Sequence, residues 1–313
     1  MQYTIRHVTK FTYESAISES VMEARMQPRS EGPQRCVHFG LSTVPASRVR
    51  RYHDQDGNIV HHFNIPGRHN RLVVTAEALV ECLPSPDRWP ASACGWEEID
   101  RRAATGEFWE LLSASQFARP TPRLEQLAGE IGLARVGTPL ECLRRLTSSI
   151  YERLEYVPQS TRVDSPIDDA LESRSGVCQD FTHVMIALVR RLGVPCRYVS
   201  GYLFQQADGA VGSSDGATHA WAEAWLPDAG WIGLDPTNNL VAGDHHIRVA
   251  VGRDYADVPP TRGVFKGVSV VRSELAVAVR VGPVGATDLT TFVPWVSREA
   301  AAPFGEADGS QQQ

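Results

Sequence analysis

Apolar and polar residues alternate over much of the first hundred residues, which is the pattern of β-strands that bury one face. In the segment YTIRHVTKFTY, every second residue falls on one face: Tyr3, Ile5, His7, Thr9, Phe11 and Tyr13. Arg6 and Lys10 fall on the other face. Asp56 and Gly57 stand between two strand-like runs and predict a hairpin. Short strands separated by turn residues predict a β-sandwich domain over residues 1–100.

The hydrophobic period then changes to that of helices. Helices are predicted in the segments GEFWELLSASQF, PRLEQLAGEIG and TPLECLRRLTSSIYERLEYV. In the third segment, Thr138 as N-cap, Pro139 at the first helical position and Glu141 three residues after the cap predict a capping box. A polar loop over residues 158–175 follows, and the segment FTHVMIALVRRL then predicts a helix that ends at Gly193.

Strand patterns return after this helix. They lie in the segments CRYVSGYLF, THAWAEAWL, GWIGLDP and VSVVRSELAVAVRV. The order of strands, helices and strands predicts an α+β chain with a second domain over residues 101–282, in which helices pack on an antiparallel sheet. Residues 283–313 form a C-terminal extension whose polar tail predicts disorder.

Composition changes this picture only by exclusion. The 313 residues, with 42% hydrophobic and 22% charged residues, are typical of a soluble two-domain protein. A net charge of −6 gives no basic footprint for nucleic acid, and no apolar run approaches the roughly 18 residues that a membrane span needs. The N-terminus lacks the apolar block of a signal peptide, so a cytoplasmic location is expected. Six cysteines without a CxxC pair predict free thiols, with neither a disulfide framework nor a zinc site.

Cys178, in the segment GVCQD, is the first candidate for chemistry because it stands at the start of the predicted helix. A helix N-terminus favours a thiolate, since its unpaired N–H groups and its dipole stabilise an anion. The same N–H groups are placed to face an oxyanion at an attacked carbonyl. Gly176 is expected to let the backbone turn sharply and a substrate approach closely. The alternative reading, a small buried core thiol, stays open at this point.

A nucleophilic cysteine also needs a base and a group that orients the base. The segment THAWAEAW places His219 on a strand, and GWIGLDP places Asp235 at the end of the following strand. Neighbouring antiparallel strands would hold the two side by side, with Asp235 fixing the tautomer of the imidazole. A histidine on a strand and an aspartate before proline also have ordinary structural explanations. The pattern of residues by itself decides neither for nor against this triad.

The segments GVCQDFTH and THAWAEAWLPDAGWIGLDPTNN resemble the transglutaminase-like superfamily, a branch of the papain-like thiol enzymes. The resemblance implies a papain-like fold and a catalytic triad of Cys178, His219 and Asp235. YTIRHVTKFTYESAISESVMEARMQPR is similar to the N-terminal β domain of bacterial members, and HHIRVAVGRDYADVPPTRGVFKG is similar to their C-terminal segment. The resemblance covers roughly residues 1–282.

Further residues have weaker assignments. By resemblance Tyr156 lines the site or assists an oxyanion hole, although a packing tyrosine at a helix end fits equally well. Gln179 is a second candidate for that role, and Asp180 is expected to brace the first helical turn. Glu223 shares a strand face with His219 and is a possible partner for it. Several histidines (His53, His61, His62, His69, His245 and His246) lack the spacing of a tight ligand set, so no metal site is predicted.

The predicted chemistry is acyl transfer from an amide of a peptide or protein to Cys178 through a thioester, without a cofactor. If water accepts the acyl group, the protein is a protease or amidase, which is the favoured outcome. If an amine accepts it, the protein is a transglutaminase that crosslinks glutamine side chains. An acyltransferase with an acyl-coenzyme donor would need a basic surface, and no basic cluster suggests one. A peptide-binding scaffold without catalysis is the alternative of a different class.

Overall fold

The computed structural model describes residues 1–84, 89–204, 214–215, 218–267 and 272–284. These residues divide into two compact units, which are described one at a time. The first unit contains residues 1–83, 203–204, 214–215, 260–267 and 272–284. The second contains residues 84, 89–202 and 218–259. Among all of these residues, no helix has the length and apolar character needed to cross a membrane.

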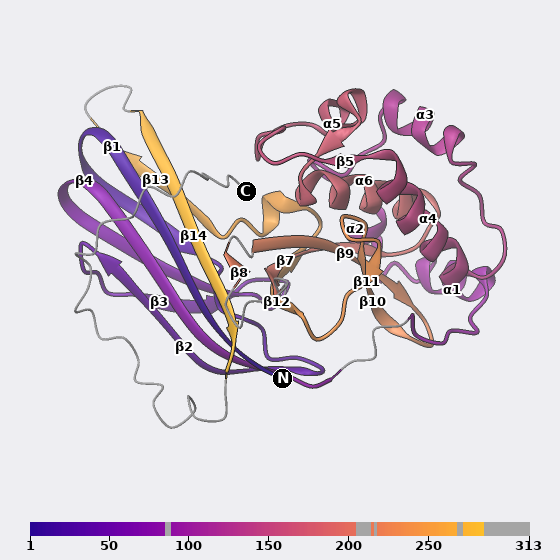
Figure 1. Ribbon diagram of the computed structural model, residues 1–313, viewed down its shortest axis with the longest axis horizontal. Helices are drawn as coiled ribbons and strands as arrows, with labels where there is room; N and C mark the ends of the chain where they lie inside the picture. The colour runs from indigo at the N-terminus through magenta and orange to yellow at the C-terminus, as the bar shows by residue number, and fades with distance from the viewer. Residues whose placement is uncertain (85–88, 205–213, 216–217, 268–271, 285–313) are drawn as a thin grey trace. The chain divides into compact units, whose positions relative to one another are not determined.

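The first unit is built on one sheet, in the order β2-β4-β1-β14-β8, with β13 also paired to β1 and β3 to β4. The strands are β1 (Gln2–Ala24), β2 (Gln34–Val44), β3 (Arg50–His53), β4 (Ile59–Cys82), β8 (Ser214–Asp215), β13 (Thr261–Lys266) and β14 (Ser273–Pro283). Figure 1 shows the long strands β1 and β4 running beside each other through this sheet. The hairpin predicted at Asp56-Gly57 is confirmed, because β3 and β4 pair on either side of it.

The buried face of β1 follows the predicted alternation and then changes phase. Tyr3, Ile5, His7 and Thr9 are buried as every second residue, whereas Ser20, Met22 and Ala24 are buried with the opposite parity. The pairing of β1 with β4 shifts in register on either side of Ile17. A bulge adds an unpaired residue, and one extra residue moves the following side chains to the other face. This irregularity in the pairing therefore lets β1 bury side chains in both of its halves.

The strand pairing differs from the predicted sandwich in its connectivity. The described strands of this unit form a single hydrogen-bonded sheet, because β1 pairs with β14 along its first half and with β13 along its second. Apart from Pro283, both partners come from residues that the sequence assigned to the 101–282 domain, yet their backbone hydrogen bonds are made with the N-terminal strand. Within the 283–313 extension, Val284 donates its N–H to the carbonyl of Gln2. The predicted disorder of the tail concerns residues 285–313, which lie outside the described part of the chain.

The second unit contains a sheet in the order β11-β10-β9-β7-β12 and a set of helices. Its strands are β5 (Glu155–Tyr156), β6 (Ser175–Gly176), β7 (Cys196–Leu203), β9 (Thr218–Leu226), β10 (Gly230–Asp235), β11 (Leu240–Val241) and β12 (His246–Gly252). Its helices are α1 (Trp96–Ala103), α2 (Trp109–Leu112), α3 (Pro122–Glu130), α4 (Pro139–Arg153), α5 (Ile167–Ser173), α6 (Cys178–Arg191) and the 3-10 turn η1 (Tyr255–Asp257).

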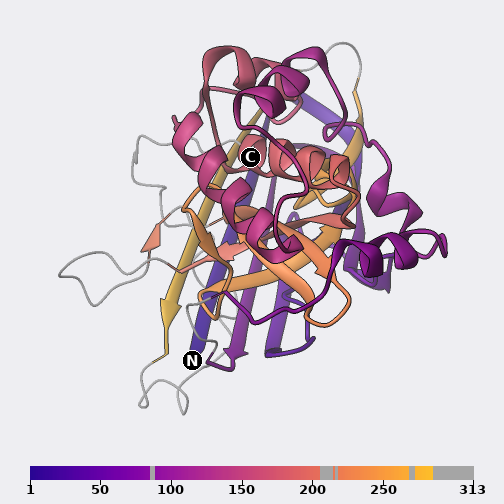
Figure 2. The ribbon, with the colours of Figure 1, turned by 90° about the vertical axis from the view of Figure 1, so that its right-hand side faces the viewer.

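Helices and sheet of the second unit form layers. Helix α6 packs against β9, and α4 packs against α6 and β10. Figure 1 shows α4 and α6 on one side of the strands, and Figure 2 shows most of the magenta and rose helices above the orange strands. Neighbouring strands β7, β9, β10 and β11 are antiparallel. The predicted class is therefore confirmed: a strand-rich N-terminal region precedes a core in which helices cover an antiparallel sheet.

Local signals in the sequence agree with most helix boundaries. Thr138 Oγ1 accepts from the N–H of Glu141 at 3.3 Å, and the Glu141 carboxylate accepts from the N–H of Thr138 at 2.9 Å, so the predicted capping box is confirmed. Helix α5 differs from the prediction of a polar loop over residues 158–175. Its buried residues Ile167, Ala170 and Leu171 have helical spacing, but seven residues are too few for that period to stand out.

Candidate active site

Cys178 is the first residue of α6, and Val177 before it has an extended backbone. Cys178 is 9% exposed, so only a small part of this residue is accessible to solvent. Thr182, one turn further on, donates its hydroxyl to the carbonyl of Cys178 at 2.7 Å. The residues from Cys178 to Arg190 are buried. The apolar run that predicted this helix therefore serves to fix the position of its first turn inside the unit.

Asp180 fastens that first turn. Its Oδ2 atom accepts from the N–H of Val177 at 2.8 Å and from the hydroxyl of Thr161 at 2.5 Å. This bracing was expected from the sequence and is present. Burial raises the pKa of Asp180, against the lowering effect of these two hydrogen bonds.

Gly176 has a different role from the one expected. It lies in the short strand β6, where its backbone makes no left-handed turn. A Cβ atom at this position would lie 2.8 Å from both Cβ and Oδ2 of Asp180. The glycine therefore leaves room for the carboxylate that caps α6, and the expectation of a sharp turn was wrong.

His219 and Asp235 meet across neighbouring strands. His219 is the second residue of β9, Asp235 is the last residue of β10, and the two strands are antiparallel. Nε2 of His219 lies 2.8 Å from Oδ2 of Asp235. Because Nε2 is engaged in this way, the other ring nitrogen, Nδ1, is the one left for the Cys178 thiol, which interacts with the ring by charge and hydrogen bonding. The three residues that the sequence singled out are thus brought together.

The electrostatics of this group favour a charged imidazole. Burial alone lowers the pKa of His219, but the charge and hydrogen bond of Asp235, with the contribution of Cys178, outweigh it and raise that pKa to about 10. Burial alone raises the pKa of Asp235, but His219, followed by His246, holds it well below its usual range. Asp235 is fully buried and stays ionised because its neighbours supply donors.

Asp235 is held by more donors than the sequence indicated. Its Oδ2 atom also accepts from Nδ2 of Asn238 at 2.8 Å and from Nε2 of His246 at 3.1 Å. Its Oδ1 atom accepts from the backbone N–H groups of Thr237 and Asn238, each at 3.1 Å. Nδ1 of His246 accepts from the N–H of Gly243 at 3.3 Å, which leaves the proton on Nε2 and so fixes a neutral tautomer that donates to Asp235.

His246 and Asn238 are the residues of this site that sequence reasoning missed. Asn238 stands in the segment DPTNN and could have been found as a turn residue that follows the aspartate. His246 gave no such signal, because it begins a strand on the far side of β7 in the sheet order.

His219, Asp235 and His246 are also close enough together to offer ligands to one metal ion. One possible ligand atom from each of His219, Asp235 and His246 lies within 4.8 Å of the other two, and all three residues are buried. However, Nε2 of His246 carries a proton that it donates to Asp235, and the remaining contacts of the carboxylate are hydrogen bonds as well. The donor set is therefore that of a proton network, and no metal chemistry is assigned to it.

Trp221 sets the positions of both histidine rings. Its ring stacks on His219 at a centroid distance of 6.2 Å and meets His246 edge-on at 5.1 Å. Gly201 stands opposite His219 in the β7–β9 register, and a Cβ there would lie 2.6 Å from the Trp221 ring. Glu223, a possible partner of His219 from its place on the strand, forms an ion pair with Arg197 at 2.7 Å.

Tyr156 and Gln179 are the two weaker candidates. Strand β5 pairs in parallel with β6, which places Tyr156 beside Gly176 and close to Cys178. Burial first, then the charge of Cys178, raises the pKa of the half-exposed Tyr156. The amide nitrogen of Gln179 donates to the carbonyl of Val163 at 3.0 Å, so this side chain holds the loop in front of α6. Tyr156 therefore lies at the site, whereas Gln179 is occupied with its own loop.

The fold defines a class of protein, the transglutaminase-like proteins with a papain-like core. The family model of the transglutaminase-like superfamily matches residues 125–236, and that of the bacterial transglutaminase-like N-terminal region matches residues 3–81. An uncharacterized protein of Mycobacterium leprae is 35% identical over 87% of this chain and 96% of its own length. The chain belongs to the transglutaminase-like superfamily.

Two further similarities are more limited in reach. A protein-glutamine gamma-glutamyltransferase of Pseudomonas aeruginosa is 32% identical over 48% of this chain and 22% of its own length. A solved structure from Cytophaga hutchinsonii, provisionally assigned as a cysteine protease, aligns with a TM-score of 0.68 at 20% identity. That alignment covers 91% of this chain and 92% of the other, and at this identity it shows the fold alone.

Proposed function

We propose that this protein is a thiol enzyme that cleaves amide bonds of peptides or proteins through a thioester on Cys178. The observation that supports the proposal is the placement of His219 between the Cys178 thiol and the buried Asp235 carboxylate. An imidazole whose pKa is raised to about 10 is protonated at neutral pH, and a neighbouring thiolate is the species that such a cation stabilises. This arrangement is suited to nucleophilic attack on a carbonyl carbon.

The reaction follows from the roles of these groups. The Cys178 sulfur forms a bond to the amide carbon, and the carbonyl oxygen becomes an oxyanion that faces the unpaired N–H groups of the first turn of α6. The imidazolium of His219 gives its proton to the leaving amine as the carbon–nitrogen bond breaks. A thioester remains, and His219 is neutral. A water molecule then loses a proton to His219 and attacks the thioester, which releases the carboxylic acid and restores the thiolate. Asp235 keeps its charge throughout.

Water is proposed as the acceptor because of the limited access to the sulfur. Cys178 is 9% exposed, and an acyl group on it occupies part of that opening. A water molecule is small enough to reach the thioester through the rest of this opening. An amine the size of a lysine side chain needs a channel of its own. Hydrolysis is therefore placed before amine transfer.

Amine transfer is the second candidate, and one finding favours it. The Pseudomonas aeruginosa relative that matches 48% of this chain is named a protein-glutamine gamma-glutamyltransferase. The first half-reaction is the same in both proposals, because an amide carbonyl is attacked and an amine or ammonia leaves. The two differ only in what attacks the thioester.

A peptide library incubated with the protein, with and without an added primary amine, tests both proposals by mass spectrometry. Chain cleavage or replacement of an amide by an acid indicates hydrolysis, and addition of the amine indicates transfer. Cys178→Ala is expected to abolish every such product. Cys36→Ala is the matched control, because Cys36 is also partly accessible and burial raises its pKa to about 11. Peptide binding without any product in the wild-type protein would refute catalysis and leave the scaffold alternative.

A further inference from the structure

A polar cavity lies in the first unit, on the N-terminal sheet. It has a volume of about 430 Å³ and is lined by residues of β2, β3, β4 and the preceding segments. The ten lining residues include two arginines and two histidines and contain neither aspartate nor glutamate. The lining is therefore positively charged, which favours an anionic occupant.

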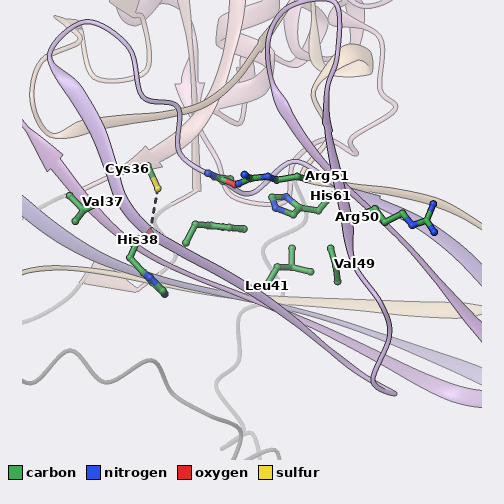
Figure 3. A pocket seen from close by; sticks show the side chains of 10 residues that line it. Cys36, Val37, His38, Leu41, Val49, Arg50, Arg51 and His61 are labelled. Carbon is green, nitrogen blue, oxygen red and sulfur yellow. Dashed lines mark hydrogen bonds between the residues drawn. The ribbon is translucent and has the colours of Figure 1, made fainter.

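Strand register places Arg51 and His61 on the same face at this cavity. Arg51 pairs directly with His61 between β3 and β4, whereas Arg50 pairs with His62. Residues that are directly opposite in an antiparallel pair project to the same side of the sheet, and the next pair along projects to the other side. Figure 3 shows the Arg51 and His61 side chains next to each other and the Arg50 side chain pointing away from them.

One ring nitrogen of His61 is buried and makes no hydrogen bond with any described residue. The residue is 6% exposed, and its Nδ1 atom is buried without a hydrogen-bond partner among the residues that the structure describes. A buried imidazole nitrogen without a partner is unfavourable, so a ligand that supplies the partner is favoured. Burial, followed by the charge of Arg51, lowers the pKa of His61 to about 4, so the ring is neutral at neutral pH and offers one N–H.

Arg51 is available for a ligand as well. It is exposed, and within the described part of the chain it makes neither an ion pair nor a hydrogen bond through its guanidinium. One part of the wall is apolar, although Gln27 and His38 also line the cavity. Leu41 and Val49 lie beneath His61 in Figure 3, and the ring of Phe39 packs against the His61 ring at a centroid distance of 4.9 Å. The cavity thus joins a cation and a hydrogen-bond donor to an apolar floor.

We infer that this cavity binds a carboxylate that is attached to an apolar group, either a small organic acid or the C-terminal end of a peptide. The carboxylate lies between the Arg51 guanidinium and the His61 N–H, and the apolar group lies on Leu41 and Val49. The inference concerns the first unit and is independent of Cys178, so it stands or falls separately from the proposed activity.

Titration of the full chain with three probes tests this site by calorimetry and by the NMR signals of the His61 ring. N-acetyl-leucine mimics a peptide end, isocaproate is a small acid without a peptide group, and N-acetyl-leucinamide is the uncharged match of the first. Both acids are expected to bind with millimolar affinity, and the first binds more tightly if the site recognises peptide ends. The amide is expected to bind at least about tenfold more weakly, as for loss of a charge-assisted hydrogen bond.

Arg51→Gln is expected to weaken the binding of both acids by about tenfold, whereas Arg71→Gln, at an exposed position of β4 that does not line the cavity, changes it by less than about twofold. Arg51 and Arg71 are both exposed, so both variants are expected to fold. In the wild-type protein, a bound carboxylate raises the pKa of His61 from about 4 towards its ordinary value, and this readout does not depend on any variant. Equal binding of acid and amide, an equal loss in the Arg71 variant, or an unchanged His61 titration would each overturn the inference.

Discussion

Replacement of Asp235 by asparagine removes one charge and keeps the shape of the side chain. In the wild-type protein the pKa of His219 is about 10 instead of 6.5, a difference that corresponds to about 5 kcal/mol of preference for the imidazolium. Without the carboxylate, burial remains as the main influence. His7 shows the result of burial alone, which lowers its pKa to about 4. The His219 ring of the variant is therefore expected to be neutral at neutral pH.

The reactivity of the Cys178 thiol is a measure of this change in the charge of His219. A cation next to a cysteine favours the thiolate, which is the form that reacts with alkylating agents. The rate of alkylation of Cys178 should therefore fall by about tenfold or more in Asp235→Asn, where the neighbouring imidazole is neutral. The pH dependence of the rate should also differ, because the wild-type His219 ring loses its proton only near pH 10 and the variant ring is already neutral at neutral pH.

Alkylation by iodoacetamide as a function of pH, followed by mass spectrometry of the Cys178 peptide, measures both effects. Asp228→Asn is the matched control: its carboxylate also accepts from backbone N–H groups, those of Ala93 and Cys94, but takes no part in the site. Circular dichroism establishes that each variant is folded. Identical pH profiles for Asp235→Asn and the wild type would refute the view that the carboxylate controls the charge of the pair.

The position of the Asp235 carboxylate, the space beside Gly176 and the charges of His219 and Asp235 can each be tested as well. His246→Phe removes one donor to the Asp235 carboxylate and should slow alkylation of Cys178 about tenfold, whereas His246→Gln, which keeps an N–H, should retain most of the rate; equal rates would contradict a positioning role. Gly176→Ala crowds Asp180 and should lower the free energy of unfolding in urea by about 1–3 kcal/mol, whereas Gly129→Ala, with open space around it in α3, should leave it unchanged or raise it. The raised pKa of His219 contributes stability that is complete below about pH 6.5 and lost as the pH rises to about 10. The lowered pKa of Asp235 contributes stability that is present above its ordinary pKa and lost in acid, so wild type and Asp235→Asn should converge in unfolding free energy at both extremes of pH.

The features that could be predicted from the amino-acid sequence are those that depend on neighbouring residues along the chain. The alternation at Tyr3 to Thr9, the capping box at Thr138 and the start of α6 at Cys178 all follow from local period and local hydrogen bonding. The motifs around Cys178, His219 and Asp235 resembled one family, and strand adjacency was enough to predict that histidine and aspartate meet.

Tertiary structure alone decided which distant segments become neighbours. A strand pattern shows which face is buried but does not identify the partner strand, so nothing in β14 indicated that it pairs with β1. For the same reason His246 was not found, because its contact with Asp235 depends on where β12 joins the sheet. The need for glycine at position 176 became visible only with the Asp180 side chain in place. Turns, caps and helix starts depend on adjacent residues, whereas contacts between strands depend on hydrogen bonds and packing across the whole unit.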